Sequence, residues 1–541
     1  MNDPSAVRAL HWSTLHGEPP AHPERLVRFR PLDPSNRPAP FKRYPDLRPS
    51  PLPRQLVPSG LAAIEVLSGR RAKTGLSGEG PRSGEGRLTE ERLSTLLFLA
   101  AGVTRYAPVQ GDEPVFFRTA MSAGNLHPVE VYVVTPSSVS HYDPLEHALT
   151  TLRGAWPEGW AQGAEGATTL VLTGIPFRTC WKYGERGWRH LWWDAGTIIA
   201  NLLAAADAQG IEAAVATGFP DAAVGELVGV DGVDELPLVL VTLGPGEAAL
   251  PEASRLGPLQ GNATPISPRL LRLPMVTAAH EASSLDTASV PAWVAAVRSV
   301  ATPAAGTVDP PRWSGPEPSP TGEAASRPGP LDRIEQVIGR RGSSRLFEAS
   351  PVPAALLEWG LGAAARAVPM DVTPGGTLLQ HLVSVHGVEG ATPGPYRYAG
   401  GRRFEAISAP PDPRESATRL CLDQVLGGDA AFTTFHAADL DRLLEAGGAR
   451  AYRAAHLEAG IVAGRLSLNA TALGFGASGI TFYDTAVARY FETSALPLLA
   501  TAVGRPETAP APSGRPGHPI ALGRYGEVSA RLYDRLRQRA R

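Results

Sequence analysis

Cysteine is nearly absent from this sequence, with only Cys180 and Cys421 among 541 residues. So few cysteines exclude a disulfide-stapled scaffold and a thiolate metal cluster, because both need several cysteines at short spacings. Net charge is almost absent too, since 51 basic and 53 acidic residues leave a formal charge of −2. Nothing in the overall charge therefore attracts the chain to nucleic acid or to an anionic membrane.

Long apolar runs are also missing. No segment reaches the roughly 20 consecutive apolar residues that a membrane helix needs, and the N-terminal residues contain no apolar signal-peptide core. We therefore expect a cytoplasmic protein that neither binds nucleic acid nor enters a membrane. Hydrophobic residues still make up 43% of the chain, enough to bury sizeable cores, and the length predicts two or three globular units.

Composition divides the chain into four parts. Residues 1–60 are rich in proline, arginine and aromatic residues without a sustained period, which predicts an extended arm. Residues 61–245 alternate between helical patterns and short apolar strands, which predicts a first domain. Residues 246–330 are rich in proline, serine and alanine and are expected to form a linker. A second patterned region at 331–541 is expected to end in a basic helix.

Two long stretches of the sequence repeat each other. Residues 186–210 align with residues 450–474 without a gap. The aligned pairs include Arg186 with Arg450, Arg189 with Arg453, Asp194 with Glu458, Gly196 with Gly460, and Gly210 with Gly474. Further matches are 218–224 with 481–487, 236–244 with 496–504 and, more loosely, 124–134 with 376–386. Composition alone could match two alanine-rich helices, but several segments agree in order and spacing, so we predict two diverged copies of one domain of about 180 residues.

Two short motifs combine residue types that suit a ligand. The sequence at 122–125, Ser-Ala-Gly-Asn, is a small turn before an apolar strand, where main chain can approach a flat ligand closely because side chains are small. Arg341, Ser343 and Arg345 follow a predicted helix and join guanidinium to hydroxyl, a combination typical of phosphate binding. Each motif also has a plainer interpretation. The sequence at 122–125 could be a tight turn with a capping serine, and the arginine motif could be a solvated basic helix end.

A third motif is the Lys182-Tyr183 pair, which stands among aromatic residues before a long predicted helix. A lysine in a partly apolar place has a lowered pKa and can accept a proton. Lysine occurs only three times in this arginine-rich chain, which favours a role that arginine cannot fill. The alternative is an exposed lysine beside a packed tyrosine.

These segments together resemble a known family. The sequences at 122–132, 182–196 and 236–244 are similar to the nitroreductase superfamily, and within it to the SagB/ThcOx-type FMN-dependent dehydrogenases, which include azoline oxidases. The resemblance is strong over 61–244 and weaker over 332–506. It implies an α+β fold in which two tandem nitroreductase-like domains form an intramolecular pseudo-dimer with FMN at their interface.

The resemblance also divides the FMN site between the two copies. The first copy keeps the Ser-Ala-Gly-Asn turn but has Arg-Arg-Ala-Lys-Thr-Gly at 70–75 in the phosphate segment, whereas the second keeps the arginine motif but has Thr-Pro-Gly-Gly-Thr at 373–377 in place of the turn. One FMN per chain is therefore expected. The implied phosphate contacts are Arg341, Ser343, Arg345 and Arg505, the implied ring contacts are Arg118, Ser122, Ala123, Gly124 and Asn125, and the main chain of Gly479, Ile480 and Thr481 is expected to face the flavin.

The resemblance implies oxidation of azolines to azoles in a ribosomally made peptide, with Lys182 as base and Tyr183 as its hydrogen-bonding partner. Two other functions stay open, namely an NAD(P)H-dependent reductase of nitro, quinone or enone compounds and a non-catalytic flavin- or peptide-binding partner protein. The expected partners are a peptide substrate and a cyclodehydratase, and no metal is implied. The chain is expected to be either a monomer, because it is already paired internally, or a homodimer.

Overall fold

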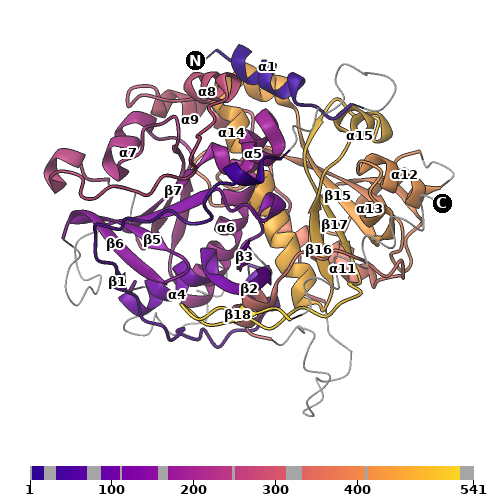
Figure 1. Cartoon of the computed structure of the whole chain (residues 1–541). Helices are drawn as coiled ribbons and strands as arrows, with labels where there is room; N and C mark the ends of the chain where they lie inside the picture. Colours follow the sequence, from indigo (N-terminus) through magenta and orange to yellow (C-terminus); the bar gives the residue numbers. More distant parts are fainter. Residues whose placement is uncertain are drawn as a thin grey trace, which may run out of the picture.

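The computed structural model describes residues 3–17, 32–69, 87–109, 112–155, 168–245, 250–306, 308–311, 332–408 and 412–523. Its two halves, purple and orange in Figure 1, each build a mixed helix and sheet layer around one antiparallel sheet. The segment at 70–75 and the predicted C-terminal basic helix lie outside the described residues. Within the described residues, no helix combines the length and apolar character needed to cross a membrane.

The first sheet contains seven antiparallel strands in the order β1-β6-β5-β4-β7-β9-β8. Its central strands are buried throughout, as their continuous apolar sequences predict. The strands are β1 (Ser50–Pro51), β4 (Val129–Val134), β5 (Ser138–Asp143), β6 (Ala148–Gly154), β7 (Thr168–Gly174), β8 (Ala213–Ala216) and β9 (Leu236–Leu243). Val131 and Val133 of β4 belong to the large core that continues into the second half, whereas Tyr132 and Val134 belong to a smaller core on the other face.

The second sheet repeats this topology. Its order is β14-β13-β12-β15-β17-β16, so the path from β13 to β16 matches the path from β5 to β8. The strands are β12 (Gln380–Val385), β13 (Gly394–Tyr398), β14 (Phe404–Ala406), β15 (Phe432–Ala438), β16 (Gly476–Ile480) and β17 (Leu496–Gly504). Even an irregularity recurs, because the register shifts between Leu172 and Thr173 in β7 and between His436 and Ala437 in β15. The predicted tandem repeat is therefore present.

Two small sheets and the helices complete the layers. Strands β2 (Val103–Val109), β3 (Asp112–Arg118) and β18 (Ile520–Ala521) form one small sheet, and β10 (Thr302–Pro303) pairs with β11 (Gly376–Thr377). The first-half helices are α2 (Ala63–Leu67), α4 (Glu90–Ala101), α5 (Pro176–Tyr183), α6 (Gly187–Gln209) and α7 (Asp221–Val228). The second-half helices are α10 (Ile334–Arg340), α11 (Ala354–Ala364), α12 (Pro413–Leu420), α13 (Val425–Asp429), α14 (Leu440–Ala472) and α15 (Asp484–Tyr490).

The long helices α6 and α14 pack against each other at the centre of the molecule (Figure 1). They are buried on nearly all sides, so even charged residues of these helices, such as Asp194 and Glu458, are buried. Their main chains meet at Gly196 and Gly460, where a Cβ atom added to Gly460 would lie 2.5 Å from the carbonyl oxygen of Trp193. The aligned glycine pair therefore marks the crossing point of the two copies.

Two segments contain more regular structure than the sequence analysis expected. Residues 1–60, predicted to be extended, include helix α1 (Ser5–Ser13), whose Val7, Leu10 and His11 are buried on one face. The predicted linker contains α8 (Pro274–Ala282), which packs against α1, and α9 (Val290–Arg298). The sequence did not predict these helices, because they are short and lie in proline-rich sequence. Tertiary packing of their apolar faces stabilises them.

Candidate functional site

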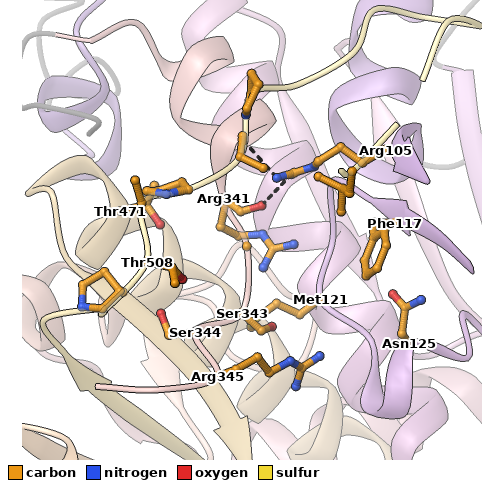
Figure 2. Close-up of a pocket in the computed structure, with 18 of the residues that line it drawn as sticks. Arg105, Phe117, Met121, Asn125, Arg341, Ser343, Ser344, Arg345, Thr471 and Thr508 are labelled. Carbon is orange, nitrogen blue, oxygen red and sulfur yellow. Dashed lines mark hydrogen bonds between the residues drawn. The ribbon is translucent and has the colours of Figure 1, made fainter. Parts of the chain in front are cut away.

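A cavity of about 680 Å³ lies between the two halves. Its first-half wall comes from β2, β3 and the turn at 122–125, and its second-half wall comes from the segment at 341–345 and the C-terminal residues 506–512 and 520–523. Figure 2 shows Arg341 and Arg345 on the side of the cavity that faces Phe117 and Asn125. The volume is that of a cavity for a cofactor-sized ligand, and the two predicted motifs share it.

The turn at 122–125 is held from behind by Asp194 of α6. The Asp194 carboxylate accepts hydrogen bonds from Ser122 Oγ at 2.5 Å and from the Ala123 amide at 3.0 Å. Gly124 adopts φ +63° and Asn125 φ +58°, a conformation that favours glycine and asparagine. The Asn125 side-chain amide donates to the Phe116 carbonyl at 2.7 Å, which ties the turn to β3. The turn is therefore rigid, and its main chain is exposed at Gly124.

Asp194 was not among the predicted site residues. It is buried, and burial raises its pKa to about 7, although the hydrogen bonds from Ser122 and Ala123 lower it. Glu458 of α14, its aligned counterpart, accepts in the same way from Thr377 Oγ1 at 2.6 Å and from the Leu378 amide at 2.9 Å. The aligned acidic pair at 194 and 458 was the sequence signal that could have identified it.

Lys182 and Tyr183 reach the same turn from the end of α5. A Cβ atom added to Gly124 would lie 2.6 Å from the Tyr183 hydroxyl and 3.3 Å from Lys182 Nζ. Burial, and then the charge of Arg345, lower the pKa of Lys182. Burial and the charge of Asp194 raise the pKa of Tyr183 to about 12, so its hydroxyl remains protonated at neutral pH. A candidate base and a candidate hydrogen-bond donor thus lie beside the exposed main chain of the turn.

The arginine motif places positive charge on the second-half wall of the cavity. Arg341 is buried, and its Nε donates to the Thr119 carbonyl at 2.9 Å. Its Nη1 has no hydrogen-bond partner within the described parts of the chain. Burial, followed by the charges of Arg105 and Arg345, lowers the pKa of Arg341 to about 9. A bound anion would relieve both the missing hydrogen bond and the like-charge repulsion.

The other predicted residues fall into two groups. Arg118, Ser122, Asn125, Arg341, Ser343 and Arg345 line the cavity. The predicted residues that do not line it are Ala123, Gly124, Lys182, Tyr183, Gly479, Ile480, Thr481 and Arg505. Ile480 is packed in the core of the second half, and Thr481 accepts from Gln424 Nε2 at 3.0 Å. Arg505 lies over the Phe475 ring at 5.2 Å and 3.7 Å from the carboxylate of Glu348. Its charge therefore faces an acid of its own half.

The pseudo-symmetric position in the other half is built differently. At the edge of β16, Ser343 of the arginine motif pairs with Ala477, but at the matching edge of β8 it is Met370 that pairs with Val215. The carboxylate of Asp371 then accepts from the Gly218 amide and the Thr217 hydroxyl, each at 2.7 Å. Met370 and Asp371 therefore lie along the edge of β8, two residues farther along the strand than Ser343 lies on β16.

The Lys-Tyr pair is likewise missing from the second half. Gly184, after the pair, has φ +58° and ψ −147°, a conformation essentially restricted to glycine, and Gly448 repeats it within α14 with φ +60° and ψ −161°. These glycines are therefore equivalent, and the residues before Gly448 are Ala446 and Gly447. Within the described residues, the turn at 122–125 and the arginine motif line one cavity, and Lys182 and Tyr183 contact the turn without lining the cavity themselves.

Comparison with known proteins gives one family. The model of the nitroreductase family matches residues 85–245 and 338–505, which is more than half of the chain. A protein of Methanocaldococcus jannaschii named "Putative nitroreductase" is 29% identical over 180 residues, which cover 32% of this chain and 91% of that protein. A solved structure from Anabaena variabilis, also named "putative nitroreductase", has a TM-score of 0.67 at 23% identity and covers 93% of this chain and 99% of its own. That structural match spans both halves and shows the same fold.

Proposed function

Because this chain belongs to the nitroreductase family, we propose that it is an FMN-dependent oxidoreductase that binds one cofactor between its two halves. The observation that carries the proposal is the meeting of two motifs from opposite halves in one cavity, with Lys182 and Tyr183 beside it. When bound, FMN supplies a two-electron acceptor or donor for hydride transfer. Binding and orienting the cofactor and the substrate, and accepting the proton, depend on the residues of the chain.

The cavity has the donors that FMN requires. A dianionic phosphate suits the end where Arg341 Nη1 lacks a partner and Arg345 and Ser343 line the wall. A flat ring suits the part of the cavity beside the turn at 122–125, which presents main chain with small side chains. Arg118 supports this end, because its buried Nε also has no partner among the described residues. These residues would bind and orient the cofactor.

We propose further that the reaction is the oxidation of an azoline ring in a peptide to an azole. In this reaction the ring loses a hydride and a proton, so the enzyme must supply a base. Lys182 would accept the proton, since burial and Arg345 hold its pKa below the ordinary value for lysine. Tyr183 keeps its proton and would donate a hydrogen bond to the substrate. A cyclodehydratase, which makes azolines, is the expected partner enzyme.

The first experiment is an absorption spectrum of the purified protein, followed by mass identification of the released cofactor. We expect a bound flavin with the mass of FMN, at one equivalent per chain. A colourless protein that does not take up added FMN would contradict the proposal. Rapid bleaching of the flavin by NADPH, with reoxidation by a nitro or quinone compound and no turnover of an azoline peptide, would favour a reductase instead.

The second experiment tests the base. Lys182→Ala should retain the flavin and lose about 10² to 10⁴ in turnover of a thiazoline-containing peptide, the range expected for general base catalysis. Lys182→Arg is the matched control, because it keeps the positive charge but cannot be deprotonated near neutral pH. Equal loss in both variants supports a base, whereas full activity in the arginine variant would show that only the charge is needed.

A further inference from the structure

We propose that Arg105 is a positioning residue that presents Arg341 to the cofactor phosphate and thereby gives the site its preference for FMN over riboflavin. The inference rests on the proposed FMN site. Arg105 belongs to β2 in the first half and was not identified from the sequence, because it stands in no motif. Its side chain is 5% exposed and extends across the interface into the second half.

The guanidinium of Arg105 joins two segments of the second half, residues 339–341 and the chain around Ala511. Its Nη2 donates to the carbonyl oxygens of Gly339 at 2.9 Å and Arg341 at 3.0 Å, and its Nη1 donates to the Ala511 carbonyl at 3.1 Å. Dashed lines in Figure 2 mark hydrogen bonds of Arg105 in the cavity. The end of α10, the start of the arginine motif and the C-terminal wall of the cavity are therefore fixed by one side chain.

These contacts determine where Arg341 can point. With its carbonyl held by Arg105 and its Nε bonded to the Thr119 carbonyl at 2.9 Å, Arg341 keeps its terminal nitrogens for a ligand, and Nη1 is buried without a partner in the described part of the chain. The two guanidinium groups repel each other, since the charge of Arg105 lowers the pKa of Arg341. Carbonyl dipoles around Arg105 offset part of that repulsion, and a phosphate would offset the rest. Lysine could not replace Arg105, because its compact ammonium lacks the planar fork that spans several carbonyl groups.

Arg366 in the second half serves as a control for Arg105. Arg366 follows α11 as Arg105 follows α4, and its Nη1 donates to the Leu67 carbonyl at the end of α2 at 2.8 Å. Arg366 is half-buried whereas Arg105 is buried, but burial lowers the pKa of each to about 10. Arg366 does not line the cavity. Loss of Arg366 should therefore cost stability without affecting phosphate recognition.

The experiment compares FMN with riboflavin, which lacks the phosphate. Dissociation constants of both flavins are measured by fluorescence titration of cofactor-free wild type, Arg105→Gln and Arg366→Gln. We expect Arg105→Gln to weaken FMN binding about 10- to 100-fold, as for the loss of hydrogen bonds to a charged group, with riboflavin binding changed less than about threefold. Arg366→Gln should leave the FMN-to-riboflavin ratio at its wild-type value.

Three results would overturn the inference or its basis. An unchanged ratio in Arg105→Gln, or an equal fall in Arg366→Gln, would show that Arg105 does not act on the phosphate. If Arg105→Gln does not fold, as judged by circular dichroism, the same titration with Arg105→Lys decides, and a wild-type ratio there overturns the inference. Failure of the wild type to bind either flavin would instead reject the proposed FMN site itself, and the role of Arg105 with it.

Discussion

Arg453 of the second half donates to the carboxylate of Asp221 in the first half at 2.9 Å, and Arg186 of the first half donates to Asp484 in the second half at 3.1 Å. All four side chains are buried. Arg450 also donates to Asp221. The sequence repeat aligns the two aspartates with each other and these arginines with their counterparts, so the interface between the halves is built twice from the same ion pairs.

We expect Asp221→Asn to destabilise the protein by about 3 to 5 kcal/mol at pH 7, because it leaves two buried guanidinium groups without their acid. The measurement is urea unfolding. Asp234→Asn is the control, since Asp234 pairs with Arg272 at 2.7 Å on the surface, where an ion pair contributes less than about 1 kcal/mol. Similar losses in both variants would contradict the structural role of the buried pair.

The same ion pair predicts a pH dependence. Burial alone would raise the pKa of Asp221, but Arg453 and Arg450 lower it to about 2. A depressed pKa stabilises the folded state above the ordinary value near 4 and loses that contribution as the pH falls toward 2. The difference in unfolding free energy between wild type and Asp221→Asn should therefore shrink between pH 4 and pH 2. A constant difference over this range would contradict the assignment.

The helix crossing gives a further prediction. Gly460→Ala places a Cβ atom 2.5 Å from the main-chain oxygen of Trp193, and backbone cannot move away easily. We expect a loss of about 1 to 3 kcal/mol from overpacking. Gly360→Ala in α11 is the matched control, because the nearest atoms, of Leu466 and Leu356, would lie 3.8 and 4.0 Å from its new Cβ. Alanine there should stabilise the helix slightly, and the two melting temperatures should move in opposite directions.

The repeat and its helical registers could be predicted from the sequence because long helices keep their spacing. The lengths of the turns before β4 and β12 could not be predicted. Ser122 and Thr377 play the same part toward Asp194 and Glu458, yet β4 begins seven residues after Ser122 and β12 only three after Thr377. The loose alignment of 124–134 with 376–386 missed this difference in length. No local pattern records how long a loop is, so only the packed structure shows the shorter turn.

The residues around the cavity could also be predicted only in part from the sequence. The motif residues were predictable because small turns and clustered arginines have a recognisable composition. Arg105 and Asp194 act on distant segments. Arg105 stands in no motif, and the alignment of Asp194 with Glu458 did not show which turn its carboxylate supports. Gly479–Thr481 and Arg505 were placed by analogy with the family, but in the structure they do not line the cavity.

Another prediction concerns Gly124. Gly124→Ala brings a Cβ atom to 2.6 Å from the Tyr183 hydroxyl, so Tyr183 and Lys182 must shift. We expect bound flavin to be retained and azoline turnover to fall at least about tenfold. Gly375→Ala is the control, because Gly375 has a similar φ of +73° but nothing within 4 Å of the added atom. Both variants should melt at a lower temperature than wild type, and equal turnover in the two would contradict a role for the contact at Gly124.

A further prediction is the number of FMN molecules that one chain binds. Two pseudo-symmetric positions exist, but Met370 and Asp371 occupy the edge of β8 that corresponds to the place of the arginine motif on β16. We therefore expect titration of the cofactor-free protein to end at one FMN per chain, and Asp371→Asn to leave this number unchanged. Two equivalents in the wild type would contradict the closure of the second position.

A variant in the described cavity tests which of the two pseudo-symmetric positions binds the FMN. Arg341→Gln removes the unpartnered Nη1 of the described cavity and leaves Thr217, Gly218 and Asp371 untouched. If the single FMN lies in this cavity, its affinity should fall at least about tenfold in Arg341→Gln, as expected for the loss of a charge-assisted hydrogen bond. If the FMN instead lies at the edge of β8, Asp371→Asn should alter its affinity and Arg341→Gln should not, because the two groups belong to opposite positions.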